Sequence, residues 1–209
     1  MDKIELIKEC IAKAERGESK LEGAVLDIGG YTSPTIRHLL NNLGSLATSY
    51  MEIGVHRGST FCSTIYKNEN IRQIFAVDNW SEFSEDPSVK AEFLENIRFA
   101  ANINGLWFSE IDCFDLNPEI INISPDLYLY DGNHADWAQK KALTHFYEAF
   151  PKEMIFCVDD SSWDAVRKGT EIGISECEFE VLFEQHLFDG QEGGRYWNGF
   201  SIYLLKKTK

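Results

Sequence analysis

Residues 50–60, YMEIGVHRGST, form the strand-to-helix turn on which the fold assignment depends. Glu52 lies at the end of a short apolar run, and Gly54 and Gly58 follow it four residues apart. A strand that breaks at glycine lets the backbone approach a bound molecule closely, and the free N–H groups of the next helix then point toward that molecule. The segment therefore predicts a turn built around a ligand. A tight turn without a ligand is the alternative.

A second apolar run, IFAVD, ends at Asp78 about 25 residues later. In α/β nucleotide-binding folds, a carboxylate at the carboxyl end of the second strand holds a ribose diol. A dinucleotide fingerprint, GxGxxG, phased on Gly54 would require glycine at Glu52 and Arg57, and both of these side chains would crowd a pyrophosphate. The spacing therefore disfavours NAD as the ligand.

The pattern acid-x-Gly-x-x-x-Gly-x-Thr resembles the first motif of the class I S-adenosylmethionine-dependent methyltransferases. In that family this loop wraps the methionine part of the donor, and the acid after the second strand holds the ribose. The family places adenine contacts where the third strand ends, near Asp112 and Cys113, although an ordinary turn or cap is an equal alternative for Asp112. The resemblance implies S-adenosylmethionine as cofactor and the following binding residues: Glu52, Gly54, Gly58, Ser59, Thr60, Asp78, Asn79, Asp112 and Cys113.

Two later strand ends narrow the resemblance to a subgroup. The chain reads PDLYLYDGNHADW from Pro125 and EMIFCVDDSSWDAV from Glu153. These resemble the macrocin O-methyltransferase-like subgroup, in which an IDGDH strand end is followed one helix later by HDD or DD. The chain departs from that pattern at Asn133, where an acid is usual, and at Val158, where histidine is common. The resemblance implies a Rossmann-like doubly wound seven-stranded α/β sheet, the class I methyltransferase fold, with an N-terminal helical segment.

The carboxyl ends of these strands predict a cluster of acids. In an open doubly wound sheet the ligand lies at the carboxyl edge where the strand order reverses, so Glu52 and Asp131 are expected to face one crevice. Asp159 and Asp160 would join Asp131 there. Like charges packed so closely raise one another's pKa unless a cation lies among them, and Mg²⁺ is the simplest cation for oxygen ligands. We expect Asp131, Asp159 and Asp160 to bind it. The alternative is a turn in which Asp160 or Ser161 caps the next helix.

Methyl transfer from a sulfonium places its chemical demand on the acceptor, because the thioether is already a good leaving group. A hydroxyl acceptor must lose its proton and align behind the methyl carbon, which a metal ion and a nearby base can achieve together. Asp131 and His134 are the candidate catalytic residues, with His134 as base or substrate hydrogen-bond partner. The alternative is that His134 only caps the following helix.

Composition limits the class of partner. The 209 residues carry a formal net charge of −14, which disfavours a nucleic-acid partner and would weakly attract cationic ligands.

The first 17 residues predict an amphipathic helix with Ile4, Ile7 and Ile11 on one face rather than a signal peptide, and no apolar run is long enough to span a membrane. We expect one cytoplasmic domain, 1–209, with a helical layer over 1–46 and a Rossmann-like core over 47–209. The five cysteines lack a CxxC motif and are expected to be reduced.

The remaining elements follow from apolar periodicity and cap residues. Residues 27–30, DIGG, mimic a first nucleotide motif, but the following segment predicts a helix with Pro34 at its first position and its end at Gly44. The expected strands cover 47–53, 74–78, a run ending near 112–113, 127–130, 154–158, 178–186 and 199–206. Further helices are expected from about 60, over 87–102 with Asp86 as cap, and over 136–150.

These observations together favour metal-assisted O-methylation of a small hydroxylated molecule. One alternative is a non-catalytic S-adenosylmethionine-binding or interaction domain of the same fold, and another is a metal-independent N- or C-methyltransferase. A homo-oligomer is compatible with the sequence. Aromatic residues could line an acceptor pocket or simply pack in the core; these are Tyr31, Trp80, Trp163, Tyr196 and Trp197.

Overall fold

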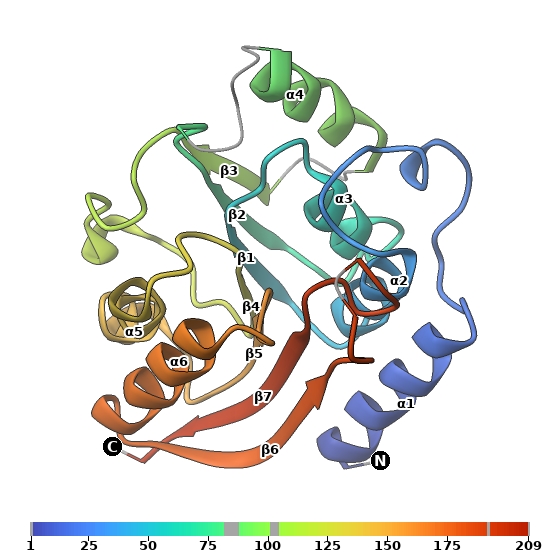
Figure 1. Ribbon diagram of the computed structural model, residues 1–209. Coiled ribbons are helices and arrows are strands. Elements are labelled where there is room, and N and C mark those ends of the chain that lie inside the picture. Colours follow the sequence, from blue (N-terminus) through green and yellow to red (C-terminus); the bar gives the residue numbers. More distant parts are fainter. Residues whose placement is uncertain (1, 82–87, 101–104, 192, 209) are drawn as a thin grey trace.

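The computed structural model describes residues 2–81, 88–100, 105–191 and 193–208, and within them strands and helices alternate along the chain (Figure 1). The strands are β1 (Ser49–Ile53), β2 (Gln73–Val77), β3 (Leu106–Ser109), β4 (Leu127–Tyr130), β5 (Glu153–Val158), β6 (Phe179–Leu187) and β7 (Phe200–Lys207). The α-helices are α1 (Lys3–Glu15), α2 (Pro34–Gly44), α3 (Ser59–Ile65), α4 (Ser88–Ala100), α5 (Asp136–Thr144) and α6 (Asp164–Glu176). Short 3₁₀ turns are η1 (Gly23–Val25), η3 (Pro118–Ile120) and η4 (Tyr147–Ala149).

The seven strands form one sheet in the order β3-β2-β1-β4-β5-β7-β6. β1 pairs in parallel with both β2 and β4, so the strand order reverses between β1 and β4. β7 is antiparallel to β5 and to β6. This mixed order confirms the predicted doubly wound Rossmann-like sheet, and it places the switch point beside Glu52 and Asp131.

Helices cover both faces of the sheet (Figure 1). The face that carries α1 to α4 has a core that includes Ile7, Leu39, Phe61 and Phe93, all fully buried. The face that carries α5 and α6 has a second core, built on Tyr128, Phe146 and Phe156 among others. The central strands are buried on both faces, which is typical of parallel strands covered by crossover helices.

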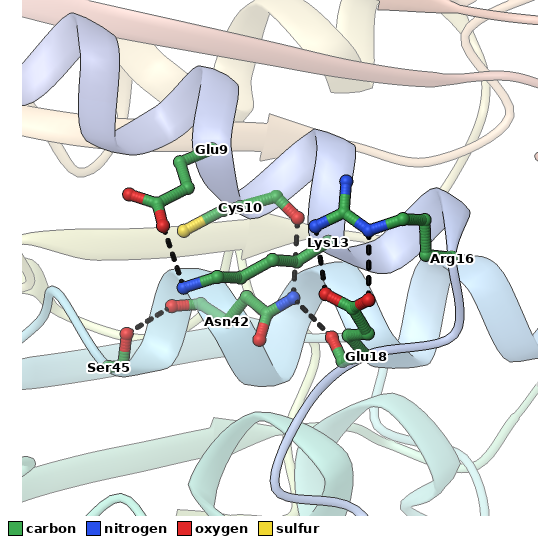
Figure 2. A network of polar contacts seen from close by, with 7 residues as sticks. All are labelled: Glu9, Cys10, Lys13, Arg16, Glu18, Asn42 and Ser45. Carbon is green, nitrogen blue, oxygen red and sulfur yellow. Dashed lines mark hydrogen bonds and ion pairs between the residues drawn. The ribbon is translucent and has the colours of Figure 1, made fainter.

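The N-terminal segment is helical, as predicted, and the DIGG segment is not a strand. Ser33 caps α2 by accepting a hydrogen bond from Ile36 N (3.2 Å), and Pro34 occupies the first helical position. Asn42 in α2 donates to the carbonyl oxygens of Cys10 (3.3 Å) and Glu18 (2.9 Å), and Figure 2 shows this amide between α1 and the segment that follows it. These bonds help to hold α1 against α2.

Two elements end several residues before the position that the sequence predicts. β3 ends at Ser109 rather than near Asp112, and Asp112 Oδ1 instead accepts a hydrogen bond from Phe114 N (2.9 Å) in a tight local turn. α5 ends at Thr144 rather than at residue 150, and the chain continues into η4. His145 at that end is hydrogen-bonded to Leu116 O (2.8 Å), a tertiary contact that helix propensity does not anticipate. The expected cap Asp86 lies outside the described residues.

Other expectations concern cysteines and membrane spans. All five cysteines are free, and four of them are buried. Among the described residues, no helix combines the length and the apolar character that crossing a lipid bilayer requires.

Gly54 lies where three strand ends meet. Its N–H donates to Val77 O (2.9 Å) at the end of β2, and Asp131 N donates to Ile53 O (2.9 Å) across from β4. Gly54 has φ +87°, and a Cβ added there would lie 1.9 Å from the carbonyl oxygen of Asp131. Only glycine therefore allows the turn after β1 to lie this close to the end of β4.

We predict that Gly54→Ala destabilises the fold by about 2–4 kcal/mol, because the methyl group adds backbone overlap to an unfavourable left-handed conformation. Gly190→Ala is the matched control, since Gly190 has φ +86° and nothing within 4 Å of the added Cβ. The control is expected to lose only about 1 kcal/mol. Urea unfolding measures the free energy of unfolding of both variants. Equal losses would show that the close contact with Asp131 does not contribute to the effect of Gly54→Ala.

Candidate functional site

A cavity of about 530 Å³ opens where β1, β2, β4 and β5 end. Eleven of the thirteen candidate binding, catalytic and metal-ligating residues line it: Gly54, Ser59, Thr60, Asp78, Asn79, Asp112, Cys113, Asp131, His134, Asp159 and Asp160. Glu52 and Gly58 are not among the lining residues. The topology thus brings most of the candidate residues together, although they come from loops far apart in the sequence.

Glu52 does not face the crevice as expected; it is fully buried behind the cavity. Its carboxyl group accepts hydrogen bonds from the hydroxyls of Thr60 (2.6 Å) and Tyr50. Burial raises the pKa of Glu52 to about 8, although the two hydrogen bonds oppose this shift. Glu52 therefore fixes the position of the Thr60 side chain, and Thr60 does line the cavity.

Gly58 sets the direction of α3 rather than contacting the cavity. It is the N-cap residue of α3, in the left-handed region at φ +85°, and Ser59 and Thr60 follow in the first turn. Gly30 packs against that turn, because an added Cβ there would lie 2.0 Å from Ser59 Oγ. The next two residues, Tyr31 and Thr32, line the cavity. The N-terminal segment thus closes the cavity on the α3 side.

Asp78 orders the loop after β2 and the loop after β1. Its Oδ2 accepts from His56 N (2.8 Å), and its Oδ1 accepts from Trp80 N (2.7 Å). The Trp80 indole N–H donates to His56 O (3.0 Å), which ties the two loops together. Each carboxylate oxygen has a second lone pair, so Asp78 can accept further hydrogen bonds from a ligand in the cavity.

Asp131, His134 and Asp160 gather at one end of the cavity. One potential ligand atom from each lies within 4.8 Å of the others, and His134 Nε2 is 2.9 Å from Asp160 Oδ2. Asp159 was expected in this group, with His134 beside it. The structure brings His134 into the group, while Asp159 lines the cavity outside it.

The acids at this end are poorly neutralised. Asp159 Oδ1 and Asp160 Oδ1 are buried without a hydrogen-bond partner among the described residues. Burial raises the pKa of Asp131 and of Asp159 well above the usual range, and neighbouring carboxylates, Asp160 among them, raise both further. Unpartnered buried oxygens of this kind are costly, so the site fits a group that brings positive charge or protons.

Both alternatives that made these residues helix caps are wrong. Ala135 is the N-cap residue of α5, and Trp163 is the N-cap residue of α6. Asp160 instead adopts a left-handed conformation at φ +51°, and Ser161 N donates to Gly199 O (3.1 Å). His134 and Asp160 are therefore available to a ligand.

The aromatic candidates divide into two groups. Tyr31, Trp163 and Trp197 line the cavity, whereas Trp80 and Tyr196 are not among the lining residues. Sequence reasoning missed several lining residues in loops or first helical turns: Thr32, Phe114, Trp137 and Asn198. Trp137 lies six residues after Asp131, in the first turn of α5. This position, close to a strand end that carries candidate residues, is the one sequence feature that could have identified it as a lining residue. The others occupy loops whose course no local pattern determines.

The comparisons with known proteins establish the fold. No family model and no curated protein matches the sequence. The O-methyltransferase TomG from Streptomyces achromogenes, solved with S-adenosylmethionine, is 14% identical, with a TM-score of 0.62 over 95% of this chain and 90% of that one. An O-methyltransferase from Bacillus cereus, solved with S-adenosylhomocysteine, is 12% identical, with a TM-score of 0.61 over 99% and 93%. TrmK of M. capricolum, also solved with S-adenosylhomocysteine, is 12% identical, with a TM-score of 0.56 over 81% and 68%. The chain therefore has the Rossmann-like fold of methyltransferases.

We predict that Glu52→Gln changes how stability depends on pH. Because the pKa of Glu52 is raised from 4.5 to about 8 in the folded state, the folded protein keeps a proton that the unfolded chain releases between these values. Its contribution to stability is therefore greatest at low pH and falls as pH rises, by up to about 1.4 kcal/mol per pH unit. Urea unfolding from pH 5 to pH 8 should show the variant gaining stability relative to the wild type. A difference that stays constant with pH would contradict the buried, protonated carboxyl.

Proposed function

We propose that the protein is an S-adenosylmethionine-dependent methyltransferase that methylates a hydroxyl group of a small molecule with the help of a divalent metal ion. The observation that carries this proposal is one cavity that joins the Gly54 turn and Asp78 to the cluster of Asp131, His134 and Asp160. The solved structures of similar fold that contain the donor or its product support the use of S-adenosylmethionine. The acid cluster supports the use of a divalent metal ion.

The donor is proposed to lie across the ends of β1, β2 and β3. Gly54 leaves room for the methionine part, and Ser59 and Thr60 offer hydroxyl groups beside it. Asp78 would accept hydrogen bonds from the ribose, while keeping its two backbone partners. The adenine is proposed to lie beside Asn79, Asp112 and Cys113, which line the cavity after β2 and β3.

The acceptor is proposed to bind at the acid cluster. Asp131 and Asp160, which lie in one group, would hold the metal ion, most simply Mg²⁺, and Asp159 next to Asp160 would complete the set of carboxylate ligands. One oxygen of Asp159 and one of Asp160 have no hydrogen-bond partner among the described residues. A bound divalent ion lowers the pKa of a hydroxyl that it contacts and helps to orient that hydroxyl. His134 would donate its Nε2–H to Asp160 Oδ2, 2.9 Å away, so that its other ring nitrogen, Nδ1, would take the hydroxyl proton and Asp160 would stabilise the resulting imidazolium.

Two alternatives can be separated from this proposal by one experiment. A non-catalytic domain of this fold would bind the donor or nothing, and a metal-independent N- or C-methyltransferase would bind the donor without a metal site. Titration calorimetry with S-adenosylhomocysteine, with and without Mg²⁺, measures both properties. We expect binding of the nucleoside and a separate binding isotherm for the ion. If S-adenosylhomocysteine does not bind, the proposed donor site is wrong. If it binds but Mg²⁺ does not, a non-catalytic domain or a metal-independent methyltransferase is favoured.

We predict that Asp78→Ala weakens S-adenosylhomocysteine binding at least about tenfold, because the ribose loses a charge-assisted hydrogen bond worth about 1.5–3 kcal/mol. Asp131→Ala should change the same affinity by less than about threefold, since its proposed partner is the metal ion. Calorimetry on both variants compares them directly. Equal losses would contradict the assignment of these two acids to different ligands.

We also predict that Asp160→Asn weakens Mn²⁺ binding at least about tenfold, because the variant removes one full charge from the site. Mn²⁺ serves as the spectroscopic substitute for Mg²⁺, and electron paramagnetic resonance counts the free ion. Asp164→Asn is the matched control, because Asp164 is exposed at the start of α6 and pairs with Arg167. S-adenosylhomocysteine affinity should change little in either variant. Unaltered Mn²⁺ binding in Asp160→Asn would rule out the proposed metal site.

A further inference from the structure

The cavity is strongly acidic along its whole length. Five aspartates line it: Asp78, Asp112, Asp131, Asp159 and Asp160. None of the lining residues in the described part of the chain is lysine or arginine, and His56 and His134 are the basic side chains present. A cavity lined in this way selects its ligands by charge.

Neighbouring basic side chains are engaged elsewhere. Arg57, in the loop after β1, forms an ion pair with Glu92 (2.8 Å) on α4. Lys141 on α5 lies over the ring of Phe114, 4.4 Å from its centroid. By sequence alone, residues 82–87, which lie outside the described residues, contain three acids and no basic residue. Among the described residues, no lysine or arginine lines this cavity to receive an anionic group.

The acid cluster is bordered by aromatic rings. Trp163 follows the Asp159–Asp160 pair, donates its backbone N–H to the backbone oxygen of Asp160 (3.0 Å), and packs edge-on against His134 with ring centroids 4.9 Å apart. Trp163 is 39% exposed and is one of the residues that line the cavity. Ser162 N donates to Asn198 O (2.9 Å), which places the Trp197–Asn198 segment beside this turn. Indole faces attract cations, most strongly where water is excluded.

The proposed ligands are themselves positively charged. S-adenosylmethionine carries one net positive charge and Mg²⁺ carries two, and the described lining offers them carboxyl groups and no lysine or arginine. Asp160 itself is more than nine-tenths buried, and its Oδ1 has no partner among the described residues. This unpartnered oxygen and Trp163 belong to the same turn, and both residues line the end of the cavity where the acceptor is expected.

We propose that the acceptor is a hydroxylated compound that carries a positively charged amine, and that the cavity rejects acceptors that carry a carboxylate or phosphate group. This inference rests on the proposed function, because it assigns the Trp163 end of the cavity to the acceptor. The amine lies against the indole of Trp163 within reach of the carboxylates, and the hydroxyl lies at the cluster of Asp131, His134 and Asp160.

Three probes of matched shape test the charge preference. Dopamine is a cation, 4-methylcatechol is neutral and 3,4-dihydroxyphenylacetate is an anion, and all three carry the same pair of ring hydroxyls. Calorimetry at pH 7 would use the full chain saturated with S-adenosylhomocysteine and Mg²⁺. We expect dopamine to bind at least about tenfold more tightly than the anion, a difference of about 1.4 kcal/mol, with the neutral probe between them. Equal or tighter binding of the anion, or no measurable binding of dopamine, would overturn the inference.

Substitution of Trp163 tests the location of the amine. Trp163→Leu should weaken dopamine binding at least about fivefold and change 4-methylcatechol binding by less than about twofold, whereas Trp163→Phe should keep most of the dopamine affinity. Trp107→Leu is the control, because Trp107 is 74% exposed on β3 and does not line the cavity. Equal effects on both probes would show that Trp163 does not contact the amine. Failure of the wild type to bind S-adenosylhomocysteine would refute the proposed function itself, whereas nucleoside binding with a preference for the anion would refute this inference alone.

Discussion

The close approach of Gly54 to the backbone of Asp131 is the constraint on which the site depends. β1 lies between β2 and β4, and the hydrogen bonds from Gly54 N to Val77 O and from Asp131 N to Ile53 O hold the three strand ends at one level. A side chain at Gly54 would separate them. Because these ends are held together, the turn after β1, the loop after β2 and the acids after β4 open into a single cavity rather than three separate surfaces.

Two kinds of buried acid meet at this edge of the sheet, and they differ in how their charge is compensated. Glu52 is surrounded by hydroxyl donors and can remain protonated, so it supports the first turn of α3 without a counterion. Asp159 and Asp160 each keep an oxygen without a partner among the described residues. Such groups reduce stability and are retained where a ligand satisfies them, which is the physical basis for placing the metal ion and the acceptor at this end.

Much of the fold could be predicted from the sequence because its central strands are short apolar runs that end in acids or glycine. The boundaries of β4 were predicted to the residue, and those of β2, β5, β6 and β7 to within one residue. The predictions for β3 and α5 extended too far, because a local turn at Asp112 and a tertiary contact of His145 end these elements. The position of Glu52 at the end of β1 led to the expectation that it faces the ligand, but this position does not show how deeply the side chain is buried.

The sequence by itself determined the alternation of strands and helices, the glycine turn and the acids at the strand ends, because these features depend on local backbone preferences and apolar periodicity. Only the tertiary structure decided which acids share a cavity, that His134 joins Asp131 and Asp160, and that Trp163 and Trp197 line the same cavity. These contacts join residues from different loops, and the positions of loops follow from the packing of the sheet and helices beneath them rather than from any local code.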